Sequence, residues 1–268
     1  MKFAVIHISD IHIRAEDDLI LSQHGKISAA CYKYMPDVEH VFFAVTGDIA
    51  FSGKAYQYEA AKIFLNKIKD NICNEYNVNV YFLFCPGNHD CDFNKSNSVR
   101  KILIENVKKN PRDELSEDVV KQCVSVLDEY EQFVLEMSPT PSLDLKLFKS
   151  YPFLFEGVSI KFNSLNFSWM SELHEKQGEM VYPVDLISKN GCDKDNNDIV
   201  ISLMHHPFNW FGQGSYHDLK DKICSVSSMI LSGHEHTFLS SDIANSNSSK
   251  FYHIEAGALQ QDPSPNFS

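Results

Sequence analysis

A β-branched and aromatic run at residues 78–84 is cut off by a proline and a glycine, and this junction constrains the fold more than any other feature. The run is typical of a buried strand. Proline fixes φ and glycine tolerates positive φ, so the pair ends the strand and turns the chain. Three polar residues follow at once: Asn88, His89 and Asp90. We therefore expect an amide, an imidazole and a carboxylate at the carboxyl end of this strand, where α/β sheets bind ligands.

Strands and helices alternate before this junction. Residues 2–9 and 41–46 have the apolar pattern of strands, and residues 17–34 and 56–71 have the pattern of helices. The run at 41–46 has no polar interruption, as expected of a strand that is buried on both faces. This alternation predicts βαβ units and a largely parallel sheet.

The second half of the chain combines helices with further strands. We predict strands at residues 158–163, 199–204, 229–232 and 251–255. Residues 94–149 are charged and helical in pattern, above all over residues 118–137. We interpret residues 94–149 as a helical cap inserted beside the site, with a solvated helical excursion as the alternative. Residues 1–268 are expected to form a single domain that carries this insert.

The other predicted strands end in similar polar residues. These groups are Asp10 and His12, Gly47-Asp48, His205-His206-Pro207, and Gly233-His234-Glu235-His236. Each group alone is also typical of a polar turn or of a structural histidine. Imidazole and carboxylate side chains at successive strand ends, however, are suitable ligands for divalent transition metals. The set as a whole predicts a metal site.

In chain order, Asp-x-His, Gly-Asp, Gly-Asn-His-Asp, His and Gly-His-x-His resemble the motifs of the calcineurin-like metallophosphoesterases. The motifs span residues 10–236, so the resemblance covers most of the chain. It implies an α/β fold, a four-layered α/β/β/α sandwich of two mixed sheets with flanking helices. It also implies two divalent metal ions. Manganese is the expected metal, with iron or zinc as alternatives.

The resemblance also implies how the metal ligands are shared. The ligands of the first metal are Asp10, His12 and His236, those of the second are Asn88, His205 and His234, and Asp48 bridges the pair. His205 is preferred over His206 because it comes first in the His-His-Pro block.

His89 matches a family position that faces the substrate without binding metal. There it is expected to protonate the leaving oxygen or to stabilise charge in the transition state. Asp90 is expected to orient the His89 ring, with a helix N-cap as the alternative. The implied reaction is in-line attack of a metal-bridging hydroxide on phosphorus, without a covalent enzyme intermediate.

Local sequence resemblances narrow the substrate. The phosphoprotein-phosphatase branch carries Asp-Arg-Gly shortly after its Gly-Asp, whereas residues 49–53 here read Ile-Ala-Phe-Ser-Gly. Residues 47–61 are similar to bacterial phosphodiesterases of the cyclic-nucleotide type, and residues 7–12 to nuclease subunits of double-strand-break repair. The leading hypothesis is a metal-dependent phosphodiesterase acting on a nucleotide or nucleic acid. A phosphomonoesterase is the second, and a non-enzymatic scaffold on the same fold is the third.

A loop and helix after the His-His-Pro turn supply candidate substrate contacts. They are Asn209, Trp210, Tyr216 and His217. An aromatic ring near the site could stack on a nucleobase. The alternative is a loop that a buried tryptophan anchors.

Composition limits partners and location. The formal net charge of −12 argues against broad binding to duplex DNA, which depends on Lys and Arg. Apolar runs fall short of the roughly 20 residues that span a membrane, so we expect no membrane partner. Seven scattered cysteines without a CxxC pair predict reduced thiols and a cytoplasmic protein. Residues 262–268 end abruptly, so we expect the natural chain to continue, with a possible further C-terminal domain. Protein partners are not predicted.

Overall fold

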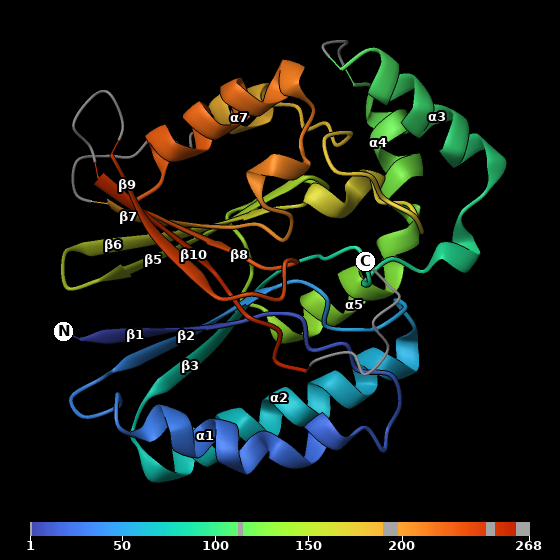
Figure 1. Ribbon diagram of the computed structural model, residues 1–268. Coiled ribbons are helices and arrows are strands. Elements are labelled where there is room, and N and C mark those ends of the chain that lie inside the picture. Colours follow the sequence, from blue (N-terminus) through green and yellow to red (C-terminus); the bar gives the residue numbers. More distant parts are fainter. Residues whose placement is uncertain (1, 112–114, 190–197, 245–249, 261–268) are drawn as a thin grey trace.

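The computed structural model describes residues 2–111, 115–189, 198–244 and 250–260. Two β-sheets pack face to face, and helices cover the outer face of each sheet (Figure 1). The layers run from helices through a three-stranded sheet and a seven-stranded sheet to a second set of helices in the described part of the chain. The predicted α/β/β/α sandwich is confirmed.

The first sheet is parallel and has the order β1-β2-β3. Its strands are β1 (Phe3–Ile8), β2 (His40–Thr46) and β3 (Asn79–Cys85). Side chains alternate along β2, where Phe42 and Ala44 face the second sheet while Phe43 and Val45 face the helices. The outer face packs against α1 (His24–Tyr32) and α2 (Ala55–Glu75). Burial of β2 on both faces explains its uninterrupted apolar sequence.

The second sheet is mixed and has the order β4-β5-β6-β7-β8-β10-β9. Its strands are β4 (Leu143–Asp144), β5 (Phe148–Phe155), β6 (Val158–Leu165), β7 (Asp198–Leu203), β8 (Met229–Ser232), β9 (Leu239–Ala244) and β10 (Lys250–Glu255). The sequence prediction missed β4, β5 and β9. Strand β4 has two residues, β5 contains Pro152, and β9 is largely polar, so none shows a clear strand pattern.

The predicted insert is helical over much of its length. It forms α3 (Ser98–Lys109), α4 (Glu117–Val124) and α5 (Asp128–Met137). Within residues 118–137, a 3₁₀ turn at Ser125–Leu127 separates α4 from α5. In this turn the Val126 carbonyl accepts a hydrogen bond from the Asp92 amide at 2.7 Å.

The helices of the insert are integral to both outer cores. Tyr130 and Phe133 of α5 pack with α2 on the first sheet, whereas Ile104 of α3 and Cys123 of α4 pack on the side of the second sheet. Helices α6 (Asp185–Lys189) and α7 (Gln213–Val226) complete the outer layer of the second sheet. The described helices of the stretch 94–149 thus contribute to the core, and its role as a helical cap beside the site stays a prediction.

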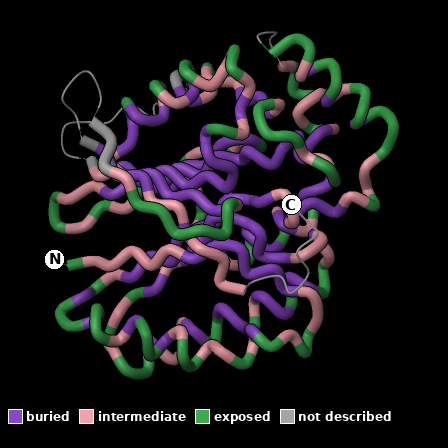
Figure 2. The backbone as a smooth tube through the Cα atoms, viewed as in Figure 1, coloured by how far each residue is buried: buried purple, intermediate pink, exposed green. Residues whose placement is uncertain are grey.

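The central core lies between the two sheets, where Figure 2 shows continuous buried strands. Its fully buried side chains come from β2, β3, β5, β6, β7 and β8: Phe42, Ala44, Leu83, Cys85, Tyr151, Ile160, Phe162, Ile201, Leu203 and Leu231. This packing sets the two sheets against each other, so that the loops after their strands meet along one edge. Within the described residues, no helix combines the length and the apolar character needed to cross a membrane.

Candidate metal centre

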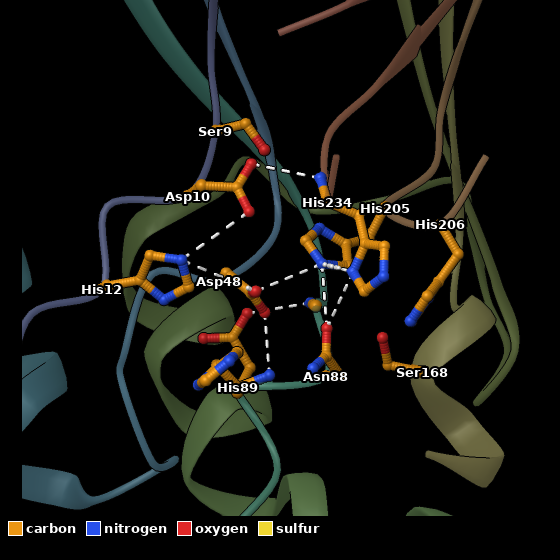
Figure 3. Close-up of polar contacts among 12 residues, drawn as sticks. Ser9, Asp10, His12, Asp48, Asn88, His89, Ser168, His205, His206 and His234 are labelled. Carbon is orange, nitrogen blue, oxygen red and sulfur yellow. Dashed lines mark hydrogen bonds and ion pairs between the residues drawn. The ribbon is translucent and has the colours of Figure 1, made fainter. Parts of the chain in front are cut away.

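The seven predicted metal ligands converge at the carboxyl ends of strands from both sheets. Figure 3 labels all of them except His236. Asp10 and His12 follow β1, Asp48 follows β2, and Asn88 follows β3. His205 follows β7, and the loop after β8 carries His234 and His236. Parallel strands end at the same edge of a sheet, which explains why ligands so far apart in sequence meet.

The first cluster combines Asp10, His12 and His236. Nε2 of His12 lies 3.2 Å from Nε2 of His236, which in turn lies 3.2 Å from Oδ1 of Asp10. Nε2 of His12 is 3.8 Å from the same carboxylate oxygen. The Asp10 and His12 side chains are buried, whereas the His236 side chain is 39% exposed. The first cluster is thus open to solvent on one side.

The second cluster combines Asn88, His205 and His234. Oδ1 of Asn88 lies 3.1 Å from Nε2 of His205 and 3.2 Å from Nδ1 of His234. The two ring nitrogens are themselves 3.2 Å apart. His205 is fully buried, and its Nδ1 donates a hydrogen bond to the Thr46 carbonyl at 2.7 Å.

Asp48 lies between the two clusters. Its Oδ2 is 3.3 Å from Nε2 of His205 and 4.0 Å from Nε2 of His12. Its Oδ1 accepts a hydrogen bond from the His89 amide at 2.8 Å. This carboxylate is the common neighbour of both clusters, as a bridging ligand would be.

The donor atoms fit a divalent cation. In a neutral His205 ring, Nδ1 carries the hydrogen that Thr46 accepts, so Nε2 presents a lone pair. That lone pair faces oxygens of Asn88 and Asp48, which also accept rather than donate. Metal–ligand bonds of about 2.0–2.1 Å place neighbouring ligand atoms of one ion roughly 3.0–3.4 Å apart. The spacings of 3.1–3.2 Å in the second cluster agree with this value.

The electrostatics point the same way. Burial alone would raise the pKa of Asp48, but the His205 and His89 rings outweigh burial and hold that pKa well below its usual value. Burial would lower the pKa of His205, yet the Asp48 carboxylate raises it to about 10. The centre therefore favours positive charge beside a carboxylate, a requirement that a metal cation meets.

Backbone strain is concentrated at the same residues. Five predicted ligands adopt positive φ: Asp10, His12, Asp48, His234 and His236. Non-glycine residues in this region cost about 1–3 kcal/mol each and gather at functional sites. The fold holds these side chains in orientations that an unconstrained chain would avoid.

Two glycines allow the loops to approach one another. A Cβ at Gly87 would lie 2.0 Å from Oδ1 of Asp48, and a Cβ at Gly233 would lie 2.0 Å from Oγ of Ser9. Any side chain at either position would displace an element of the centre. The glycines of the Gly-Asn-His and Gly-His-x-His motifs are thus required by close packing.

The structure corrects the predicted role of Asp90. The His89 ring is oriented by the Phe51 carbonyl, which lies 2.8 Å from Nδ1. The buried Asp90 carboxylate instead accepts hydrogen bonds from the amides of Ile49, Ala50 and Gly87 and from the Tyr58 hydroxyl. Asp90 therefore ties the loop after β2 to the loop after β3, and it caps no helix. Burial and the charge of Asp48 raise the pKa of Asp90 to about 6.

The predicted substrate contacts separate into two places. Trp210 lies at the centre, with its ring centroid 4.3 Å from that of His234. Asn209, Tyr216 and His217 instead line a surface hollow with Gln177, Gly178, Phe211 and Gln213, and this lining includes none of the predicted metal ligands. A role of these residues as substrate contacts stays a prediction.

Other residues at the centre escaped the sequence reasoning. The guanidinium of Arg14 lies 4.4 Å from the centroid of Phe51, whose ring in turn packs against His89. His206 pairs with Glu175, at 3.0 Å from Nε2 to Oε2. His206 was visible in the sequence as the second residue of the His-His-Pro block, but nothing in the sequence signalled Glu175 or Arg14.

Comparison with known proteins places this geometry in a family. The model of the calcineurin-like phosphoesterases matches residues 3–238. The chain belongs to the calcineurin-like phosphoesterase family. Membership confirms the resemblance drawn from the motifs.

Two individual proteins extend the comparison. The chain is 24% identical over 277 residues to YydB of Bacillus subtilis, an uncharacterized metallophosphoesterase-like protein. The match covers 98% of this chain but 54% of YydB, so the chain spans about half the length of that relative. A solved structure of GAP50, described as the anchor in the inner membrane complex of Plasmodium, aligns with a TM-score of 0.49 and 12% identity. That alignment covers 98% of this chain and 75% of the GAP50 chain.

Proposed function

We propose that this protein is a metal-dependent phosphodiesterase that hydrolyses a nucleotide or nucleic-acid phosphodiester with two divalent ions, expected to be Mn²⁺. The observation that carries the proposal is the position of Asp48, whose Oδ2 faces a ligand of each cluster. A site for one ion would need ligands beside only one of the two clusters, whereas Asp48 has a predicted ligand of each cluster beside it. The fit of the donor atoms supports a pair of ions.

Each cluster is assigned one ion. Asp10, His12 and His236 would hold the first, Asn88, His205 and His234 the second, and Asp48 both. Two ions bound in this way would polarise the phosphoryl group and acidify a water molecule.

His89 is assigned the transfer of a proton to the leaving oxygen. Its Nδ1 hydrogen bonds to the Phe51 carbonyl and therefore carries a hydrogen, which leaves Nε2 as the atom that can exchange a proton. The ring is half-buried and packs edge-on against His12, at 4.7 Å between centroids. His89 is thus fixed beside the first cluster with one nitrogen available.

The preference for a diester is drawn from the sequence. Residues 49–53 lack the Asp-Arg-Gly of the phosphoprotein-phosphatase branch, and residues 47–61 are similar to phosphodiesterases of the cyclic-nucleotide type. Nucleotide and nucleic-acid diesters both fit this similarity.

Turnover of bis-p-nitrophenyl phosphate and of p-nitrophenyl phosphate in Mn²⁺ tests the proposal. We expect faster hydrolysis of the diester, and loss of that activity in Asp48→Asn but not in Asp70→Asn, a matched change on the exposed face of α2. A preference for the monoester would replace the phosphodiesterase by a phosphomonoesterase. Two bound ions without turnover of either ester would favour the non-enzymatic scaffold.

A further inference from the structure

We propose that two anchored rings, His206 and Trp210, pack against the ring of His234 and so position a ligand of the second metal ion. Glu175 anchors His206, and Glu235 anchors Trp210. The inference depends on the proposed function, because it assigns these four residues to the metal centre of that reaction. They are positioning residues, since they act through His234 rather than on the substrate.

The ring of His234 packs against two neighbouring rings that also contact each other. Its centroid is 4.4 Å from that of His206, with 43° between the ring planes, and 4.3 Å from that of Trp210, with 87° between the planes. The centroids of His206 and Trp210 are themselves 5.5 Å apart. Rotation of His234 toward either neighbour is blocked by that ring, so the two contacts restrict the orientations open to His234.

Each flanking ring is held by a carboxylate. Nε2 of the fully buried His206 lies 3.0 Å from Oε2 of Glu175, whose side chain is only 10% exposed. Nε1 of Trp210 donates a hydrogen bond to Oε1 of Glu235 at 2.8 Å. Glu235 is the residue between His234 and His236, so the Trp210 bond also fixes the loop that supplies ligands to both clusters.

His234 has particular need of such support. Ligand histidines are ordinarily oriented by a hydrogen bond from their second ring nitrogen. In the described part of the chain, the hydrogen-bond contacts of the His234 ring involve Nδ1, toward Asn88 and His205. Its backbone also has a strained φ of +76°. Packing against His206 and Trp210 supplies the orientation that hydrogen bonding elsewhere provides.

The same contacts bear on the predicted role of Trp210 as a substrate contact. The indole N–H is engaged by Glu235, and the ring packs on a predicted metal ligand. A ring held in this way is better suited to positioning His234 than to adapting to a nucleobase.

Calorimetric titration of the metal-free protein with Mn²⁺ tests this positioning role through metal binding rather than through turnover. For the wild type we expect two binding events. In Glu175→Gln and in Trp210→Phe, which loses only the indole N–H and part of the ring, one event should weaken by about 10–100-fold while the other is unchanged. In both variants at stoichiometric metal, the electron paramagnetic resonance spectrum of a coupled Mn²⁺ pair should be replaced by that of isolated Mn²⁺.

Glu172→Gln is the matched control for Glu175→Gln. Glu172 lies in the same loop but pairs with Lys108 of α3, so its replacement should leave both binding events unchanged. Wild-type Mn²⁺ affinities at both sites in Glu175→Gln and in Trp210→Phe would contradict the positioning role of His206 and Trp210 and leave the proposed function intact. A wild-type protein that binds no Mn²⁺ would overturn both. Because Trp210 is partly exposed, its variant remains informative even if the change at buried Glu175 prevents folding.

Discussion

The two ligand clusters share Asp48 but are built differently. In the second cluster, His205 is fully buried and hydrogen bonded to the Thr46 carbonyl, and His234 is packed against two rings. In the first cluster, His236 is 39% exposed, and the buried Nδ1 of His12 has no hydrogen-bond partner among the described atoms. The second cluster is a continuation of the core, whereas the first borders on solvent.

This difference shows how one metal centre can combine rigidly held ligands with a side that is open to substrate. Ligands that are held by packing and hydrogen bonds need no reorganisation to bind an ion, so we expect the second ion to bind more tightly. The open side of the first cluster, next to His89, is where a substrate could enter.

Replacing one histidine from each cluster should give the largest effects and separate catalysis from stability. His205→Ala and His236→Ala should each lower diester turnover by about 10³-fold, since a metal ion contributes several kcal/mol to transition-state stabilisation. Only His205→Ala should also destabilise the fold, by about 1–3 kcal/mol, because it removes a fully buried ring and one of the two hydrogen bonds to the Thr46 carbonyl. Turnover and urea unfolding measure the two effects. Equal destabilisation by both variants would remove the distinction between the clusters.

The pH dependence of folding stability includes a contribution from His253, which lies outside both clusters. Burial lowers the pKa of His253, which hydrogen bonds with Ser232, to about 4. Between pH 6.5 and 4 the unfolded chain binds this proton and the folded chain does not, so stability falls as the pH falls. His253 should account for about 3 kcal/mol of that loss.

Urea unfolding of His253→Gln across this pH range measures the contribution. The variant should show a shallower loss of stability between pH 6.5 and 4, and the exposed His174→Gln should behave as the wild type. An unchanged slope in His253→Gln would contradict this assignment and point to other buried groups, such as His7, whose pKa burial also lowers to about 4.

Adding a methyl group at the motif glycines should disturb the clusters without removing a ligand. Gly87→Ala would push on Asp48, the shared carboxylate, and Gly233→Ala on Ser9 and Asp10 of the first cluster. A displacement of about 1 Å costs roughly 10²-fold in rate, so both variants should lose about that much turnover. Gly25→Ala in α1, where a Cβ meets nothing within 4 Å, should be neutral. Normal turnover in Gly87→Ala would mean that Asp48 does not need its observed position.

The smallest expected effect is the difference in affinity between the two ions, which gradual removal of metal should reveal. We expect a chelator to strip the solvent-exposed first cluster before the second, with affinities that differ by about tenfold or more. Titration of the Mn²⁺-loaded protein against a chelator of known affinity gives both constants. Simultaneous loss of both ions, or a reversed order in which His205→Ala retains the tighter ion, would contradict this ranking.

The sequence was sufficient to place the predicted ligands together, because each follows a strand and parallel strands end at one edge. It was not sufficient for contacts between loops. Asp90 binds the amides after β2 instead of His89, since the approach of two turns determines its partners. Glu175 and Glu235 meet His206 and Trp210 across loops that have no periodic pattern. Short or polar strands such as β4 and β9 were missed for the same reason.

Anomalous diffraction from crystals grown with Mn²⁺ would show directly whether the centre is binuclear. We expect two manganese peaks on either side of Asp48, one among Asp10, His12 and His236 and the other among Asn88, His205 and His234. A single peak, or peaks that do not adjoin Asp48, would contradict a binuclear centre.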